Sequence, residues 1–180
     1  MAGVATFSTL SLDKAANGYT IAASSAGLTG ATSSAFNISA STASKLAFLV
    51  QPTNVAGGAV FGANIKVQVL DSNNNLVAGS SAPVTMAIQT NPAAGTLAGT
   101  TTVNAVAGEA TFSDLSIDKA GAGYVLRATS GALTLTDSSP FNVTVCAAAK
   151  LAFSSQPSDA ASGAAIAPAI TVLVQDAGGN

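Results

Sequence analysis

The sequence predicts an all-β chain that consists of tandem copies of one antiparallel β-sandwich. Three observations lead to this prediction: a long internal repeat, apolar residues that alternate with polar ones, and turn-forming residues between the alternating segments. The composition agrees with a folded chain, because 48% of the 180 residues are hydrophobic and only 8% are charged. A disordered chain normally has the opposite balance.

The repeat has a constant offset of 105 positions, which takes Gly3 to Gly108 and holds without a gap to the last residue. Nearly half of the aligned residues are identical. Corresponding pairs include Phe7 and Phe112, Asp13 and Asp118, Tyr19 and Tyr124, Lys45 and Lys150, and Asp71 and Asp176. A unit of about 100 residues has the size of one sandwich domain, whereas solenoid units have roughly 20 to 45 residues. We therefore expect an array of domains.

A Lys-Leu-Ala-Phe motif, which begins at Lys45 and again at Lys150, sets the expected domain boundaries. Residues 45–149 would form one complete repeat. Residues 1–44 would be the C-terminal part of the repeat before it, and residues 150–180 the N-terminal part of the next. Neither partial segment contains a counterpart of residues 76–105. The connection between repeats would be only a few residues long, at 147–149, and would leave little freedom between neighbours.

Period-2 alternation predicts the strands of the complete repeat, about seven in number. The alternating apolar sets are Ile65, Val67 and Val69; Val84, Met86 and Ile88; Tyr124, Leu126 and Ala128; and Phe141, Val143 and Val145. The Asp-Ser-Asn-Asn-Asn sequence at 71–75 predicts a turn after the first set. A slip of the apolar phase between Phe112 and Leu115 predicts a β-bulge. Helix is the competing interpretation because alanine is abundant, but no segment has an apolar stripe at helical spacing, and glycine recurs every few residues.

The two tyrosines of the chain, Tyr19 and Tyr124, occupy corresponding positions, and each follows a predicted turn. In immunoglobulin-type sandwiches, a tyrosine at such a position turns its hydroxyl back onto the backbone of the preceding corner. This placement predicts the immunoglobulin type, and it favours a structural role for both tyrosines over a ligand-binding one.

Four motifs together resemble the tandem bacterial immunoglobulin-like repeats of large surface and secreted proteins. They are Lys-Leu-Ala-Phe-x-x-Gln-Pro, Val-x-Asp-x-x-x-Asn, Ala-Thr-Phe-Ser-x-Leu-Ser and Gly-Tyr-x-(Leu/Ile)-x-Ala, and the resemblance extends over essentially the whole chain. It implies an extracellular or cell-surface location and a stalk that holds a terminal adhesive, lectin or enzymatic module away from the cell. Fold alone does not determine function, so this role is an analogy.

The residues argue against an enzyme. The chain has no histidine, which removes Ser-His-Asp and Cys-His arrangements and the common zinc sites, and Cys146 has no base to activate it. We expect Cys146 to be a small buried residue at a strand end; the alternative is a reactive thiol or an intermolecular bridge. No catalytic, cofactor-binding or metal-binding residue is expected.

Composition also limits the partners. The six basic residues are spread singly along the chain, so no nucleic-acid surface is expected. No apolar run approaches the roughly 18 residues of a membrane span.

The sequence also offers two hypothetical sites, a calcium site and an internal isopeptide bond. The loops at 71–75 and 176–180 offer oxygen ligands for calcium, but each has one carboxylate where useful affinity takes several, so a hairpin turn is the default. Lys45 and Asn142 lie on expected first and last strands, as an internal isopeptide bond would require. The acid that such a bond needs does not recur, because Glu109 corresponds to Val4.

The leading functional hypothesis is a structural spacer whose partners are the neighbouring repeats of the same chain. A second is an adhesive module that binds a glycan or protein; the absence of tryptophan argues against sugar stacking. A third is a fibre subunit that joins other copies through β-strand addition, because incomplete sandwich segments have open edges.

Overall fold

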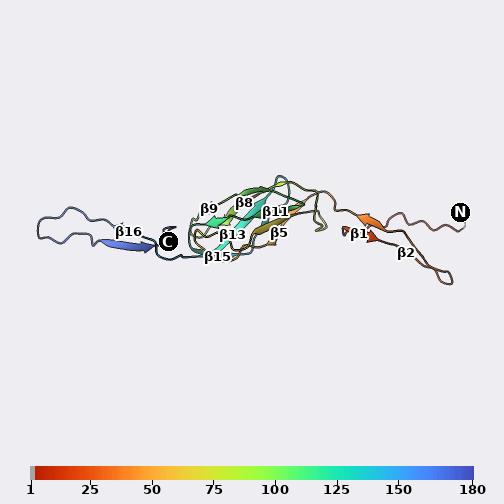
Figure 1. Ribbon diagram of the computed structural model, residues 1–180, viewed down its shortest axis with the longest axis horizontal. Coiled ribbons are helices and arrows are strands. Elements are labelled where there is room, and N and C mark those ends of the chain that lie inside the picture. The colour runs from red at the N-terminus through yellow and green to blue at the C-terminus, as the bar shows by residue number, and fades with distance from the viewer. Residues whose placement is uncertain (1–2) are drawn as a thin grey trace.

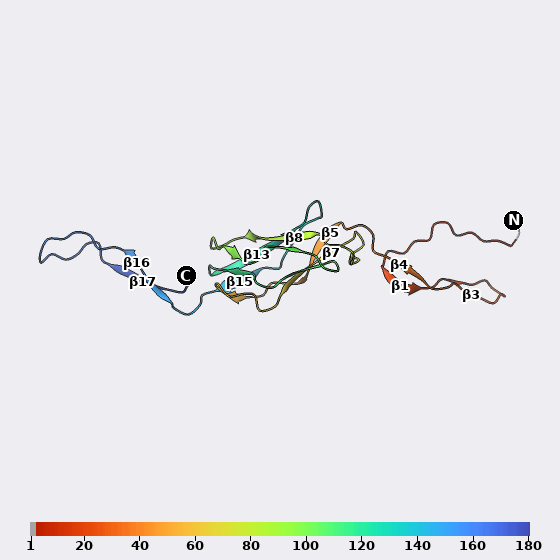
Figure 2. The ribbon, with the colours of Figure 1, turned by 45° about the horizontal axis from the view of Figure 1, so that its top comes forward.

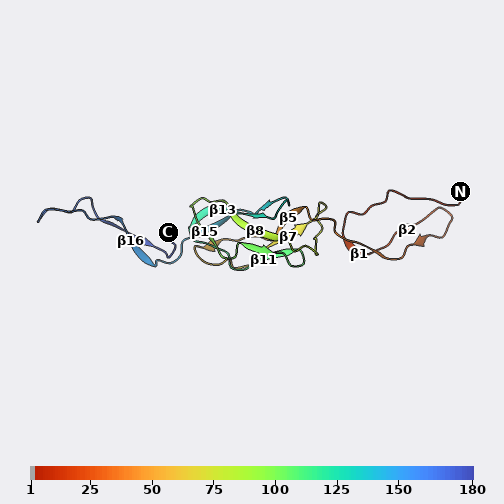
Figure 3. The ribbon, with the colours of Figure 1, turned by 90° about the horizontal axis from the view of Figure 1, so that it is seen from above.

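The computed structural model describes residues 3–180 and contains strands but no helix. The prediction of an all-β chain is therefore confirmed. The larger sheets form a central body, and short paired strands extend from it in opposite directions, so that the chain is elongated (Figures 1, 2 and 3). No helix capable of crossing a membrane occurs among residues 3–180.

The central body contains eleven strands, of which four have only two residues and were not expected. They are β5 (Lys45–Val50), β6 (Val55–Ala56), β7 (Ile65–Leu70), β8 (Pro83–Thr90), β9 (Leu97–Ala98), β10 (Thr102–Asn104), β11 (Glu109–Phe112), β12 (Ser116–Ile117), β13 (Gly121–Thr129), β14 (Thr136–Asp137) and β15 (Phe141–Thr144). The flanking strands are β1 (Ala16–Tyr19), β2 (Ala22–Ala23), β3 (Ala31–Thr32) and β4 (Phe36–Ile38) on one side, and β16 (Lys150–Ser155) and β17 (Thr171–Gln175) on the other.

Two main sheets form the central body. The larger has the strand order β10-β8-β13-β15-β6, with β14 also paired to β13, and the smaller has the order β11-β7-β5. All pairs are antiparallel except β15 with β6, which is parallel. The short strands β9 and β12 form a separate pair. Residues of both main sheets contribute to a single hydrophobic core that extends from Leu46 to Val143.

Side-chain alternation explains why these segments pair as they do. Val67 and Val69 of β7, Val84 of β8 and Leu126 of β13 are completely buried, while polar neighbours on the same strands point outward. Burying one such side chain stabilises the fold by about 1.5–3 kcal/mol. The alternating pattern therefore determines which face of each strand is buried.

Two details of the strand prediction are wrong. Val145 is 65% exposed, because β15 ends at Thr144 and the chain leaves the sheet there. No bulge lies between Phe112 and Leu115: β11 pairs with β7 in unbroken register, and β12 pairs with β9. The slip in apolar phase marks a change of pairing partner, which a sequence cannot distinguish from an extra residue within one strand.

The flanking segments repeat the central sequence without its burial. Phe7 is 73% exposed and its counterpart Phe112 is 2% exposed; Leu151 is 70% exposed and its counterpart Leu46 is 4% exposed. The predicted domain boundaries after residues 44 and 149 stay predictions.

Candidate inter-repeat joint

Two contacts connect the central body to its flanking segments. In the first joint, a loop at residues 71–75 contacts a corner at residues 13–15 and the backbone of Ser41. In the second joint, a loop at residues 176–180 contacts a corner at residues 118–120 and the backbone of Cys146. Each member of the second joint lies 105 positions after its counterpart in the first.

Asp71 organises the first loop. It follows directly after β7, and its Oδ1 accepts hydrogen bonds from the backbone N–H groups of Asn73 and Asn75, both at 2.9 Å. Asn74 has a φ of 64°, in the left-handed region that asparagine tolerates better than most residues. The sequence prediction of a turn at this position is confirmed.

The same Asp-Asn pair reaches across to the preceding segment. Asp71 Oδ2 accepts the N–H of Ser41 at 2.9 Å and the side-chain amide of Asn75 at 2.9 Å. The Asn75 amide also donates to the Asp13 carbonyl at 2.8 Å, while its Oδ1 accepts the N–H of Ala15 at 3.0 Å. One asparagine side chain therefore satisfies both a donor and an acceptor of the corner backbone.

Two lysines complete the first joint from either side of the connection. Lys14 Nζ donates to the Asn73 carbonyl at 2.9 Å, and Lys45 Nζ donates to the Ser72 carbonyl at 3.2 Å. A charged donor strengthens such a bond relative to a neutral one.

The second joint has the same bonds. Ala120 N–H donates to Asn180 Oδ1 at 2.8 Å, and the Asn180 amide donates to the Asp118 carbonyl at 2.9 Å. Asp176 Oδ2 accepts the Cys146 N–H at 3.0 Å. The lysine contacts recur as well, from Lys119 Nζ to the Gly178 carbonyl and from Lys150 Nζ to the Ala177 carbonyl.

A tyrosine hydroxyl binds the backbone of the corner in each joint. The Tyr124 hydroxyl donates to the Lys119 carbonyl at 2.9 Å, and the Tyr19 hydroxyl donates to the Lys14 carbonyl at 3.1 Å. The predicted contact between each tyrosine and its preceding turn is therefore present. Burial, and then the negative charge of Asp118, raise the pKa of Tyr124. A Cβ on Gly95 would lie 2.7 Å from this hydroxyl, so glycine allows the close approach.

Both joint carboxylates are buried and ionised. Asp71 is 1% exposed and Asp176 is 2% exposed. Hydrogen bonds from the Asn75 side chain, and then from its backbone, lower the pKa of Asp71 to about 2. For Asp176 the backbone N–H of Cys146 is the largest cause, followed by the Asn180 side chain, and the pKa again falls to about 2. Neither carboxylate belongs to an ion pair among residues 3–180, so polar N–H groups stabilise the charge.

The geometry does not fit calcium in either loop. The two oxygens of Asp71 accept four N–H donors, and a cation would have to displace them. Calcium takes six to eight oxygen ligands, and each loop supplies one carboxylate. Among residues 3–180, no group of three or more His, Cys, Asp or Glu side chains could hold a metal ion.

The proposed isopeptide residues have separate partners. Lys45 binds the Ser72 carbonyl, Asn142 Oδ1 accepts the N–H of Gly123 at 3.0 Å, and Glu109 bonds to the side chain of Gln68 at 2.9 Å. The structure therefore does not bring Lys45, Asn142 and Glu109 together.

Cys146 lies in the second joint after the end of β15. Its thiol is half-buried and unpaired, and Sγ donates to the Gly57 carbonyl at 3.0 Å. Its counterpart is Ser41, so the joint uses the backbone N–H of this position and not a particular side chain.

Sequence reasoning interpreted the two loops as ordinary turns and missed the joints. A signal was present: Asp and Asn are identical in both loops, whereas the three residues between them all differ. The lysines at 14 and 119 and at 45 and 150 are also identical. Only the folded chain shows that these positions face one another.

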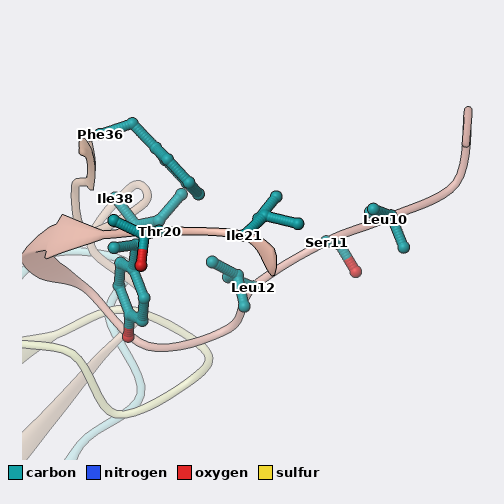
Figure 4. Close-up of a pocket in the computed structure, with 8 residues that line it drawn as sticks. Leu10, Ser11, Leu12, Thr20, Ile21, Phe36 and Ile38 are labelled. Atoms are coloured by element: carbon teal, nitrogen blue, oxygen red, sulfur yellow. The ribbon is translucent and has the colours of Figure 1, made fainter. Parts of the chain in front are cut away.

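A pocket on residues 10–38 does not indicate a ligand site (Figure 4). Its lining includes Leu10, Leu12, Tyr19, Ile21, Phe36 and Ile38. The counterparts of these six residues are Leu115, Ile117, Tyr124, Leu126, Phe141 and Val143, all of which are at most 3% exposed in the central core. The pocket therefore corresponds to the interior of a repeat.

Comparisons with known proteins do not identify a family for the chain. No protein-family model matches the chain, and no curated protein matches its sequence. Among solved structures, the chain is similar to the structure of surface layer protein SbsC, domains 4–9, with 20% sequence identity and a TM-score of 0.40 over 86% of this chain. The match covers 23% of that chain. This level of similarity does not indicate a function.

Proposed function

We propose that the chain is a structural spacer from a bacterial extracellular or cell-surface protein, in which immunoglobulin-like repeats form a semi-rigid stalk. The observation that carries the proposal is the recurrence of one bonding pattern at both joints. Linkers without such contacts behave as flexible chains, and each joint here adds several hydrogen bonds that restrict movement between neighbours.

Two observations support the immunoglobulin type in this proposal. Two facing sheets, antiparallel except for the pair β15–β6, enclose one core, and a tyrosine hydroxyl binds the backbone five residues earlier at both equivalent corners.

In this role the protein is not an enzyme, and its principal partners are its own neighbouring repeats. In both joints, the polar groups at the ends of the repeat are already engaged with the adjacent segment. The pKa values of Asp71 and Asp176 are lowered by hydrogen bonds that hold the loops together, so these shifts need no catalytic explanation.

Small-angle X-ray scattering of the full chain tests the spacer. We expect an elongated particle with a well-defined maximum dimension. A double variant, Asn75→Ala with Asn180→Ala, should give a broader distance distribution, because both joints lose their corner contacts. Identical curves for the two proteins would show that the joints do not restrict the chain and would overturn the proposal. Circular dichroism of both proteins controls for loss of the central body.

A fibre subunit is the second candidate, and exposed apolar residues in the flanking segments favour it. Phe153 is 56% exposed and Val174 is 69% exposed, and a strand from another copy could cover such residues. However, residues 150–180 of one copy and 3–44 of another would still lack a counterpart of β8, which pairs with both β10 and β13 and contributes Val84 and Met86 to the core. Electron microscopy of the purified chain separates the candidates, because fibres would favour the second.

A further inference from the structure

We infer that each corner is a docking surface for a general class of loop, an Asp followed four residues later by an Asn, and that the side chains of the three residues between them take no part in recognition. The corner sequence Asp-Lys-Ala would then accept neighbouring repeats that carry such a loop, provided that the middle residues fit the space beside the corner. The inference deepens the proposed spacer function and rests on it, since it specifies the partner of each joint.

The two loops provide a natural comparison. Residues 72–74 are Ser-Asn-Asn, and residues 177–179 are Ala-Gly-Gly. These segments contribute only backbone atoms to the joint: the carbonyls of Ser72 and Asn73 in the first, and those of Ala177 and Gly178 in the second. The two loops differ in all three side chains, yet the bonds between loop and corner are the same in both joints.

The corner also presents mainly backbone. In the first joint it offers the Asp13 carbonyl, the Ala15 N–H and, from the connection, the Ser41 N–H. The one side chain that contributes is the lysine, which is present in both corners as Lys14 and Lys119. Ser41 in the first joint corresponds to Cys146 in the second. Both donate to the loop aspartate through the backbone N–H, so the change of side chain does not affect this bond.

The order of the two key residues is fixed by hydrogen-bond chemistry. An ionised aspartate only accepts, and Asp71 receives four N–H donors. An asparagine both donates and accepts, and Asn75 uses both functions on the corner. If the two residue types were exchanged, an asparagine at position 71 would turn an NH₂ group towards some of the N–H donors around it. An aspartate at position 75 would place a carboxylate against the Asp13 carbonyl.

The two joints differ in how closely the loop approaches the corner. A Cβ built on Gly178 would overlap the Asp118 carbonyl, whereas the first joint accommodates Asn73 at the same position. The conservative direction for an exchange is therefore to place the residues of the second loop in the first.

The test replaces the middle of the first loop with that of the second in the full chain: Ser72→Ala, Asn73→Gly and Asn74→Gly. Amide hydrogen exchange, measured by nuclear magnetic resonance, follows the N–H groups of Ala15 and Ser41. We expect protection to change by less than about fivefold, because glycine adds chain entropy at position 73 but fits the left-handed conformation at position 74 without strain. The N–H groups of Ala120 and Cys146 in the second joint of the same molecules are the control.

A matched variant inverts the key pair, Asp71→Asn with Asn75→Asp. Protection of the Ala15 and Ser41 N–H groups should fall by more than about tenfold while the second joint keeps its protection. Loss of protection in the triple variant, or full protection in the inverted one, would overturn the inference. Failure of the spacer proposal can be distinguished from failure of this inference. If the spacer proposal fails, the wild type and the joint variants give identical scattering curves, whichever amides are protected.

Discussion

Tyr124 and Asn180 both bind the same three-residue corner at residues 118–120. The Tyr124 hydroxyl donates to the Lys119 carbonyl at 2.9 Å, and the Asn180 side chain binds the flanking Asp118 carbonyl and Ala120 N–H at 2.9 and 2.8 Å. Tyr124 belongs to the central core, and Asn180 belongs to the loop that docks on it. The central core therefore shapes the surface on which residues 176–180 dock.

Removing the tyrosine hydroxyl should weaken both the fold and the second joint. Tyr124→Phe leaves the Lys119 carbonyl without its donor, and we expect a loss of about 1 kcal/mol in the free energy of unfolding, measured with urea. Tyr19→Phe is the matched control, since Tyr19 lies outside the buried core and its bond is solvent-exposed. Equal effects of the two substitutions would contradict this explanation.

Acid should release the joints. In an unfolded loop Asp71 has its ordinary pKa of 3.8. In the folded, docked loop the Asn75 side chain and backbone, and then the Ser41 backbone, lower this pKa to about 2, so protons bind preferentially to the unfolded loop. The contribution of the carboxylate is fully present above about pH 4 and is lost as the pH falls towards 2. Carboxyl carbon chemical shifts of Asp71 and Asp176 across this range check the prediction, and a midpoint near 3.8 for both would disprove it.

The acid titration needs its own controls. The pKa values of Asp114 and Asp137 are also lowered, the first by hydrogen bonds from Thr100 and the second by Arg127, so the central body loses stability in the same pH range. Circular dichroism at each pH separates unfolding from joint release. In Asp71→Asn, the first joint should already be open at neutral pH, while the second joint keeps its acid dependence.

One core position can be tested against its own copy. Phe112 is 2% exposed, and Phe112→Ala should destabilise the central body by about 3–5 kcal/mol, because it leaves a cavity. The corresponding Phe7 is 73% exposed, and Phe7→Ala should change the free energy of unfolding by less than about 0.5 kcal/mol. Thermal unfolding of both variants measures the difference; similar losses would mean that Phe7 is buried in solution.

Metal removal should leave the joints intact. The oxygens of Asp71 and Asp176 already accept N–H donors, so we expect no bound cation that a chelator could remove. We expect the amide protection of Ala15 and Ala120 to be the same with excess calcium and with excess chelator. A calcium-dependent increase in protection would show that a cation enters the loops after all.

The sequence alone determined the secondary structure class and the face that each strand buries. Alternation of apolar and polar residues identified the buried sides of β7, β8 and β13, because side chains on a strand point to opposite faces in turn. The repeated tyrosine and its turn predicted the contact of its hydroxyl with the preceding backbone. These features depend on neighbours that are close in the chain, and a linear pattern contains that information.

Only the tertiary structure decided what the loops do. Asp71 meets Ser41, 30 residues away, and Asn75 meets Asp13, 62 residues away, so no local pattern records either contact. The tertiary structure also showed that the chain changes sheets between Phe112 and Ser116, where the sequence pattern predicted a bulge. Whether an aspartate in a turn faces water or a neighbouring repeat depends on how separate segments are placed in space, and hydrogen bonds that act over about 3 Å become visible only after that placement.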